Sequence, residues 1–227
     1  MALLEVEHLR VEFETRRGNL VAIDDVSLAI EEGEVLGIVG ESGAGKSITG
    51  MAIIGLLEPP GRVTGGEIRL AGRRIDNLAY EDMRRIRGKE IGAIFQDPLT
   101  SLNPLYSVGR QLAETIMAHT EASPTAARAR AIQLLGEVGI PAPERRIDAY
   151  PHEFSGGMRQ RVGLARALAV NPRLIIADEP TTALDVSIQA QIIQLLKRLC
   201  RDHGTAIMLI THDMGVIAET ADRVAAM

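Results

Sequence analysis

Residues 40–47 read Gly-Glu-Ser-Gly-Ala-Gly-Lys-Ser and have the types and spacing that can bind a phosphate chain. They fit the pattern G-x-x-x-x-G-K-[ST] and stand between an apolar segment and a stretch with helical apolar spacing, which is the context that the pattern needs. Glycines let successive backbone N–H groups turn toward phosphate oxygens, and a helix N-terminus adds partial positive charge. A ligand-free turn would need no lysine followed by serine, so we predict a nucleotide-phosphate site. Its predicted phosphate-binding residues are Gly40, Ser42, Gly43, Ala44, Gly45, Lys46 and Ser47.

Two acidic residues, Asp178 and Glu179, follow the apolar run Leu-Ile-Ile-Ala. They are the second group of residues that could take part in chemistry. An apolar strand delivers such residues to the carboxyl edge of a parallel sheet, where ligands bind in folds of this kind. Asp178 and the Ser47 hydroxyl are the predicted Mg²⁺ ligands, and Lys46 is predicted to reach the β- and γ-phosphates. Glu179 can act as general base toward a water molecule. Alone the acidic pair could open a helix, but beside the phosphate loop it indicates an ATP- and Mg²⁺-dependent hydrolase.

Length and composition suit one large α/β domain or two small ones. The chain has 227 residues, 46% of them hydrophobic, and a net charge of −5, which argues against a general nucleic-acid binder. The longest apolar run, residues 206–210, is far too short to span a bilayer, and the acidic N-terminus does not resemble a secretory signal. A single cysteine, Cys200, excludes an internal disulfide. We therefore expect a folded cytosolic protein.

The elements that must position these groups follow from apolar periodicity. Two strand-like stretches around a polar turn predict an antiparallel hairpin, and alternating strands and helices after residue 172 predict a parallel sheet with crossover helices. The expected strands are 3–13, 20–30, 34–40, 66–71, 91–95, 174–178 and 205–211, and the expected helices are 46–57, 187–202 and 214–221.

The domain organisation predicted from this pattern is a single domain over residues 1–227. An antiparallel β subdomain and the first part of the phosphate-loop core occupy residues 1–96, and the rest of the core occupies residues 167–227. Between them, residues 97–166 are helix-rich with frequent prolines, which indicates an inserted helical subdomain. Residues 222–227 look like the opening of a further strand, so we expect this sequence to be part of a longer chain.

Residues 154–161, Phe-Ser-Gly-Gly-Met-Arg-Gln-Arg, resemble the signature motif of ABC ATPases, usually written Leu-Ser-Gly-Gly-Gln. The resemblance covers nearly the whole chain and implies a P-loop NTPase fold of the ABC type. Four further positions match: Gln96 as the Q-loop residue, Asp185 as the D-loop residue, His212 as the switch histidine and Phe13 as the adenine-stacking aromatic. Met158 departs from the usual motif, where glutamine is commonest.

The resemblance also implies roles for these residues. Ser155, Gly156 and Gly157, with Asp185, would contact the nucleotide held by a partner domain, so that each site is completed by two domains. His212 would contact the γ-phosphate and orient the attacking water. Gln96 would sense Mg²⁺ and that water. The implied catalytic set is Glu179, His212 and Gln96, and the implied metal set is Ser47, Gln96 and Asp178.

Residues 95–104, 150–161 and 178–186 are similar to the dipeptide/oligopeptide importer branch of ABC ATPases, which also includes nickel importers. The Met-containing signature resembles the first ATPase of a pair. That implies a heterodimer with a second ATPase, bound at the cytoplasmic face of the membrane to two transmembrane permeases and served indirectly by an extracytoplasmic substrate-binding protein. Members of this branch carry a C-terminal extension, which is missing here.

Two alternatives to a transport ATPase remain open. A soluble ABC ATPase acting on DNA or ribosomes is disfavoured by the net charge and by the lack of a long coiled-coil insertion. A regulatory nucleotide-binding module without turnover conflicts with the complete catalytic set.

Overall fold

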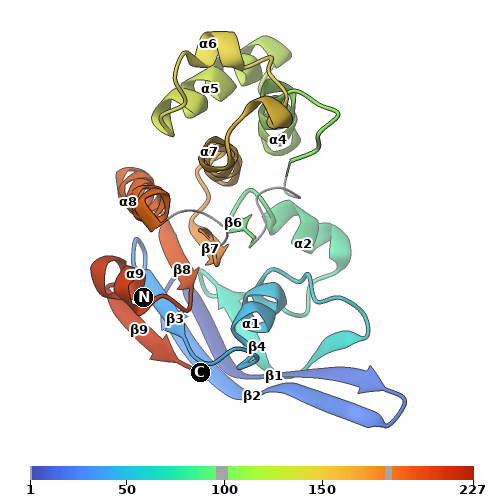
Figure 1. The fold of residues 1–227 in the computed structure, drawn as a ribbon. Helices are drawn as coiled ribbons and strands as arrows, with labels where there is room; N and C mark the ends of the chain where they lie inside the picture. The colour runs from blue at the N-terminus through green and yellow to red at the C-terminus, as the bar shows by residue number, and fades with distance from the viewer. Residues whose placement is uncertain (1, 96–101, 182–185) are drawn as a thin grey trace.

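A computed structural model describes residues 2–95, 102–181 and 186–227, which form two sheets and a group of helices (Figure 1). The N-terminal sheet is antiparallel, in the order β2-β1-β4-β5. The predicted hairpin is its centre, with Leu4 facing Ile30 at one end and Thr15 facing Gly18 at the turn. The strands of this sheet are β1 (Leu4–Thr15), β2 (Gly18–Ile30), β4 (Gly61–Leu70) and β5 (Arg73–Arg74).

The second sheet is parallel throughout and has the order β6-β7-β8-β3-β9. Its strands are β3 (Val35–Val39), β6 (Ile91–Ile94), β7 (Leu174–Asp178), β8 (Ala206–Ile210) and β9 (Arg223–Ala226). In this order the carboxyl ends of β7, β8 and β3 lie next to one another. The loops that follow these three strands therefore meet at one edge of the sheet, as such folds require for a ligand site.

The parallel sheet separates two hydrophobic clusters. Leu36, Ile176 and Met208 point to one face and pack with Ile53 of α1 (Lys46–Ile53) and with the antiparallel sheet. Alternate residues such as Ile175 point to the other face and pack with the apolar side of α8 (Val186–His203). Burial on both faces explains why these strands read as continuous apolar runs.

Helices occupy most of the described chain between β6 and β7 (Figure 1). They are α4 (Val108–His119), α5 (Pro124–Glu137), α6 (Pro143–Arg146) and α7 (Gly156–Ala167), with a 3₁₀ turn, η1 (Pro151–Glu153), before α7. Three of them begin at a serine, Ser107, Ser123 and Ser155, whose hydroxyl accepts the backbone N–H three residues on, each at 3.3 Å. Two further helices, α2 (Tyr80–Ile86) and α9 (Met214–Thr220), pack at the core.

The predicted extent of the helix after the phosphate loop, residues 46–57, is wrong. The helix ends at Ile53 because Gly55 adopts a left-handed conformation with φ 63°. The Gly55 N–H then donates to the Ala52 carbonyl and the Leu56 N–H to the Met51 carbonyl, the pair of bonds that closes a helix at a C-terminal glycine. The strand predicted at 66–71 likewise begins earlier, at Gly61, because β1 is long enough to pair with it from Phe13 onward.

No helix in the described ranges is both long and apolar enough to span a membrane.

Candidate functional site

The phosphate loop joins β3 to α1, and its conformation depends on glycine. Gly45 stands immediately before α1 with φ 92°, and a Cβ there would lie 3.1 Å from Cγ1 of Ile23. The Lys46 side chain is buried and folds back over the loop, where Nζ donates to the carbonyls of Gly40 at 2.9 Å and Glu41 at 2.8 Å. The ammonium is therefore held at the mouth of the loop, where it can exchange these bonds for those of an anion.

Ser47 and Asp178 meet across the edge of the parallel sheet. The Ser47 hydroxyl donates to Oδ1 of Asp178 at 3.0 Å, joining the start of α1 to the end of β7. Burial raises the pKa of Asp178, the bond from Ser47 opposes that shift, and the neighbouring Glu179 charge adds to it. A positive ligand at this edge would favour the ionised carboxylate.

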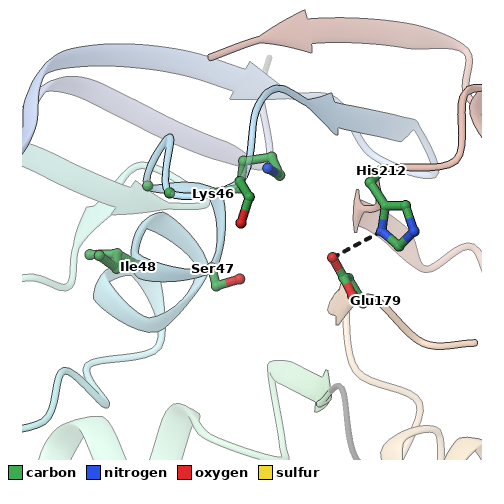
Figure 2. A pocket seen from close by; sticks show the side chains of 8 residues that line it. Lys46, Ser47, Ile48, Glu179 and His212 are labelled. Atoms are coloured by element: carbon green, nitrogen blue, oxygen red, sulfur yellow. Dashed lines mark hydrogen bonds and ion pairs between the residues drawn. The ribbon is translucent and has the colours of Figure 1, made fainter. Parts of the chain in front are cut away.

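Glu179 and His212 form the opposite wall of the site. Glu179 follows β7 in a left-handed conformation with φ 45°, and its backbone N–H donates to the Ile210 carbonyl of β8 at 2.8 Å. Its side chain is 21% exposed, and Oε1 lies 3.2 Å from Nδ1 of His212, whose ring is 72% exposed. Figure 2 shows this pair facing the start of α1 across open space. The carboxylate and the imidazole can thus act on one group placed between them and the phosphate loop.

These residues enclose a cavity of about 340 Å³. Its lining confirms that the two groups singled out in the sequence come together in space, although the motifs are separated by more than a hundred residues. It is lined by Ser42, Gly43, Gly45, Lys46, Ser47, Ile48, Glu179 and His212.

Several predicted site residues lie away from this cavity lining. Ser155 is exposed at the N-terminus of α7, with Gly156 and Gly157 in the first helical turn. Phe13 is half-buried in β1, and its ring packs against Gly61 of β4. Gly40 and Ala44 belong to the phosphate loop, although their atoms do not line the cavity. Gln96 and Asp185 lie outside the described residues.

Gln160 and Ile48 near the site were not predicted from the sequence. The Gln160 side chain is buried, and Nε2 donates to the carbonyl oxygen of Pro180, the residue after Glu179. A polar residue on an apolar helix stripe is a signal that could have found it, because Gly157 and Leu164 lie three and four residues away on the same face. Ile48 carries no comparable signal.

Comparisons with known proteins agree on one family. The family profile described as ABC transporter matches residues 23–182. The chain is 55% identical to the oligopeptide transport ATP-binding protein OppD of Bacillus subtilis over 226 residues, which is 99% of this chain and 63% of that protein. It is 49% identical to the dipeptide transport ATP-binding protein DppD of Escherichia coli, over all of this chain and 69% of that protein. The chain thus spans about two thirds of the length of these relatives.

Solved structures give the same result for the fold. The dimeric post-hydrolysis state of the ATP-binding cassette MJ0796, bound to ADP and Pi, superposes with a TM-score of 0.86 and 31% identity. The match covers 99% of this chain and 94% of that chain. The expected ABC-type fold is therefore confirmed.

Proposed function

The chain belongs to the ABC transporter family, and from this premise we propose that it is the ATP-binding and ATP-hydrolysing subunit of a membrane importer for dipeptides or oligopeptides. The observation that carries the proposal is one cavity in which Lys46 and Ser47 face the Glu179–His212 pair, with Asp178 hydrogen-bonded to Ser47. Such a site can bind a triphosphate on one wall and activate water on the other. The names of the similar proteins supply the peptide substrate class.

Nucleotide binding rests on the phosphate loop. In the proposed complex Lys46 exchanges the carbonyls of Gly40 and Glu41 for the β- and γ-phosphate oxygens, which are stronger acceptors because they are charged. The backbone N–H groups of residues 42–47 surround the phosphate chain, and the α1 dipole adds to the attraction. Phe13 is proposed to stack on adenine.

The oxygen groups of Ser47 and Asp178, at the edge of the parallel sheet, fit Mg²⁺. The Ser47 hydroxyl and an Asp178 carboxylate oxygen are 3.0 Å apart, and Mg²⁺ is usually held by one or two carboxylates together with substrate phosphates. Bound there, the ion would neutralise charge on the β- and γ-phosphates. Gln96 is proposed as a further ligand.

Glu179 and His212 supply the hydrolytic chemistry. Glu179 accepts a proton from water as the water oxygen bonds to the γ-phosphorus, and the bond between that phosphorus and the ADP oxygen breaks, giving ADP and phosphate. His212 contacts the γ-phosphate and orients the attacking water from a place beside the carboxylate. The 3.2 Å contact between Nδ1 and Oε1 keeps both groups directed at one position.

The exposed turn at Ser155 supports a site shared between two chains. A serine hydroxyl and two glycine N–H groups at a helix N-terminus suit an anion, yet they do not line the cavity of their own chain. We therefore propose that Ser155, Gly156, Gly157 and Asp185 contact a nucleotide held by a second ATPase subunit. Two transmembrane permeases at the cytoplasmic face of the membrane and an extracytoplasmic peptide-binding protein complete the proposed importer.

The test is to tag the full-length native protein, extract it from its own membranes in mild detergent and identify what copurifies by mass spectrometry. A second ATPase with two multispanning subunits, and ATP turnover stimulated by the peptide-loaded binding protein, is the expected result. Stimulation by a nickel-loaded protein instead would reassign the substrate. Copurification with ribosomal or DNA-bound proteins and no permease would overturn the transport function.

A further inference from the structure

Gln160 has an unusual environment for a buried amide. It is 2% exposed in α7, and Nε2 donates to the carbonyl oxygen of Pro180. Its other polar atom, Oε1, is buried and has no hydrogen-bond partner in the part of the chain that the structure describes. Among the described residues, only one end of this amide is hydrogen-bonded, and the side chain lies where it is shielded from solvent.

A second buried glutamine, Gln111 in α4, shows what a structural amide looks like in this protein. Its Nε2 donates to the carbonyls of Asn103 at 3.0 Å and Tyr106 at 2.9 Å. Its Oε1 accepts the backbone N–H of Asn103 at 2.9 Å, so the amide closes a loop with both ends used. Gln160 makes no such closure.

An unpaired buried acceptor destabilises a fold, whereas an apolar side chain of the same shape avoids that cost. Methionine at position 160 would remove the unpaired Oε1, but it would also leave the buried Pro180 carbonyl without its donor. The amide at this position thus serves the Pro180 carbonyl, and the place of that carbonyl in the chain indicates what the bond does.

The bond ends one residue from the proposed general base. Glu179 has a left-handed backbone with φ 45°, a conformation that a non-glycine residue keeps only where the surrounding structure holds it. On one side the Glu179 N–H is bound to the Ile210 carbonyl of β8. On the other side the Pro180 carbonyl is bound to Gln160 of α7. The two bonds together fix the peptide segment from which the Glu179 carboxylate reaches His212.

We propose that Gln160 is a positioning residue for hydrolysis: it holds the Glu179–Pro180 backbone so that the Glu179 carboxylate faces the γ-phosphate site. The inference rests on the proposed ATPase function and deepens it. Because Gln160 and Ser155 stand on the same helix, five residues apart, the bond also connects the turn proposed to meet the partner's nucleotide with the base that acts on this chain's own nucleotide. Displacement of α7 as two chains close would thereby change the position of Glu179.

The test compares Gln160→Met with Gln111→Met in the full-length protein assembled with its partner subunits. Methionine keeps the length of glutamine and removes both polar atoms. For Gln160→Met we expect kcat for ATP per folded molecule to fall at least about tenfold, with unchanged affinity for a non-hydrolysable ATP analogue. For Gln111→Met we expect an unchanged kcat per folded molecule. Both variants remove a buried amide that donates to backbone carbonyls, so both are expected to lower the thermal midpoint, and kcat is the quantity that separates them.

Turnover by Gln160→Met within about twofold of wild type would overturn the inference. So would a loss of kcat that is matched by an equal loss of analogue affinity, or an equal loss of kcat per folded molecule in Gln111→Met, because either pattern describes a purely structural residue. Absence of ATP turnover in the wild-type complex would instead refute the proposed function itself, so the two failures are distinguishable.

Discussion

The cavity at the edge of the parallel sheet and the turn at the start of α7 use similar parts in opposite ways. Each presents a serine at a helix N-terminus preceded or followed by glycines. Ser47 faces inward and is bound to Asp178 at 3.0 Å, with Glu179 and His212 across the cavity. Ser155 is exposed, and its hydroxyl accepts the Met158 N–H of its own helix at 3.3 Å.

The difference in surroundings indicates a division of labour. The cavity is lined by the Lys46 ammonium, the Glu179 carboxylate and the His212 imidazole, and Asp178 is bound to its Ser47, so it has groups that can bind a nucleotide and also perform chemistry on it. The α7 turn has no acidic residue in its first helical turn and offers N–H and O–H donors alone. It can stabilise an anion but cannot activate water. This contrast supports the proposal that one chain carries a catalytic half, the cavity, and a recognition half, the α7 turn, which complete each other between two chains.

Replacing Glu179 with glutamine tests the catalytic half most directly. The amide cannot take the proton from water at neutral pH, so we expect kcat to fall by about 10²–10⁴-fold. ATP affinity should remain because the phosphate loop is untouched. Phosphate release in the assembled complex measures the first quantity and binding of a non-hydrolysable analogue measures the second. Near-normal turnover would remove Glu179 from the catalytic role.

Replacing Lys46 with alanine tests nucleotide binding in the same cavity. A hydrogen bond to a charged group contributes about 1.5–3 kcal/mol, so the analogue should bind roughly 10- to 100-fold more weakly. Lys197→Ala is the matched control, because its ammonium also donates to a backbone carbonyl, that of Glu219, but outside the cavity. Equal affinities in the two variants, measured by equilibrium dialysis, would contradict the assignment of the phosphate loop.

The two regions also differ in how far they were predictable. Residues 40–47 form a local pattern whose spacing already fixes a loop and a helix start, and the strand order then brought Glu179 and His212 to it. The end of α1 was predicted wrongly because two stop signals follow the helix. The prediction relied on Pro59 and Pro60, whereas the helix ends at the earlier signal, Gly55. The position of Gln160 on an apolar helix stripe could have marked it as buried, but nothing in the sequence indicates that its partner is Pro180, twenty residues later.

The recognition half is tested by Ser155→Asp. Aspartate still caps a helix, so α7 should remain folded, but its negative charge would repel a partner's phosphate. We expect kcat to fall by about tenfold or more, with analogue affinity at this chain's own loop unchanged. Ser123→Asp makes the same change at the cap of α5, where the serine also accepts an N–H at 3.3 Å. Equal effects of the two variants on turnover would show that Ser155 is only a cap.

The smallest expected effect concerns Met158, where the family more often has glutamine. Its sulfur lies 3.9 Å from Nη1 of Arg146, whose guanidinium is also 5.9 Å from the centre of the Phe154 ring. In Met158→Gln the oxygen of the new amide can accept a hydrogen bond from Arg146. That bond would direct the N–H groups of the glutamine toward the surface that a second chain is proposed to cover. Since Ser155 and Gly157 already supply donors there, we expect KM for ATP to change by less than about threefold. A larger decrease, measured by steady-state turnover in the assembled complex, would mean that the donors at the α7 turn are insufficient and that methionine weakens the recognition half of this chain.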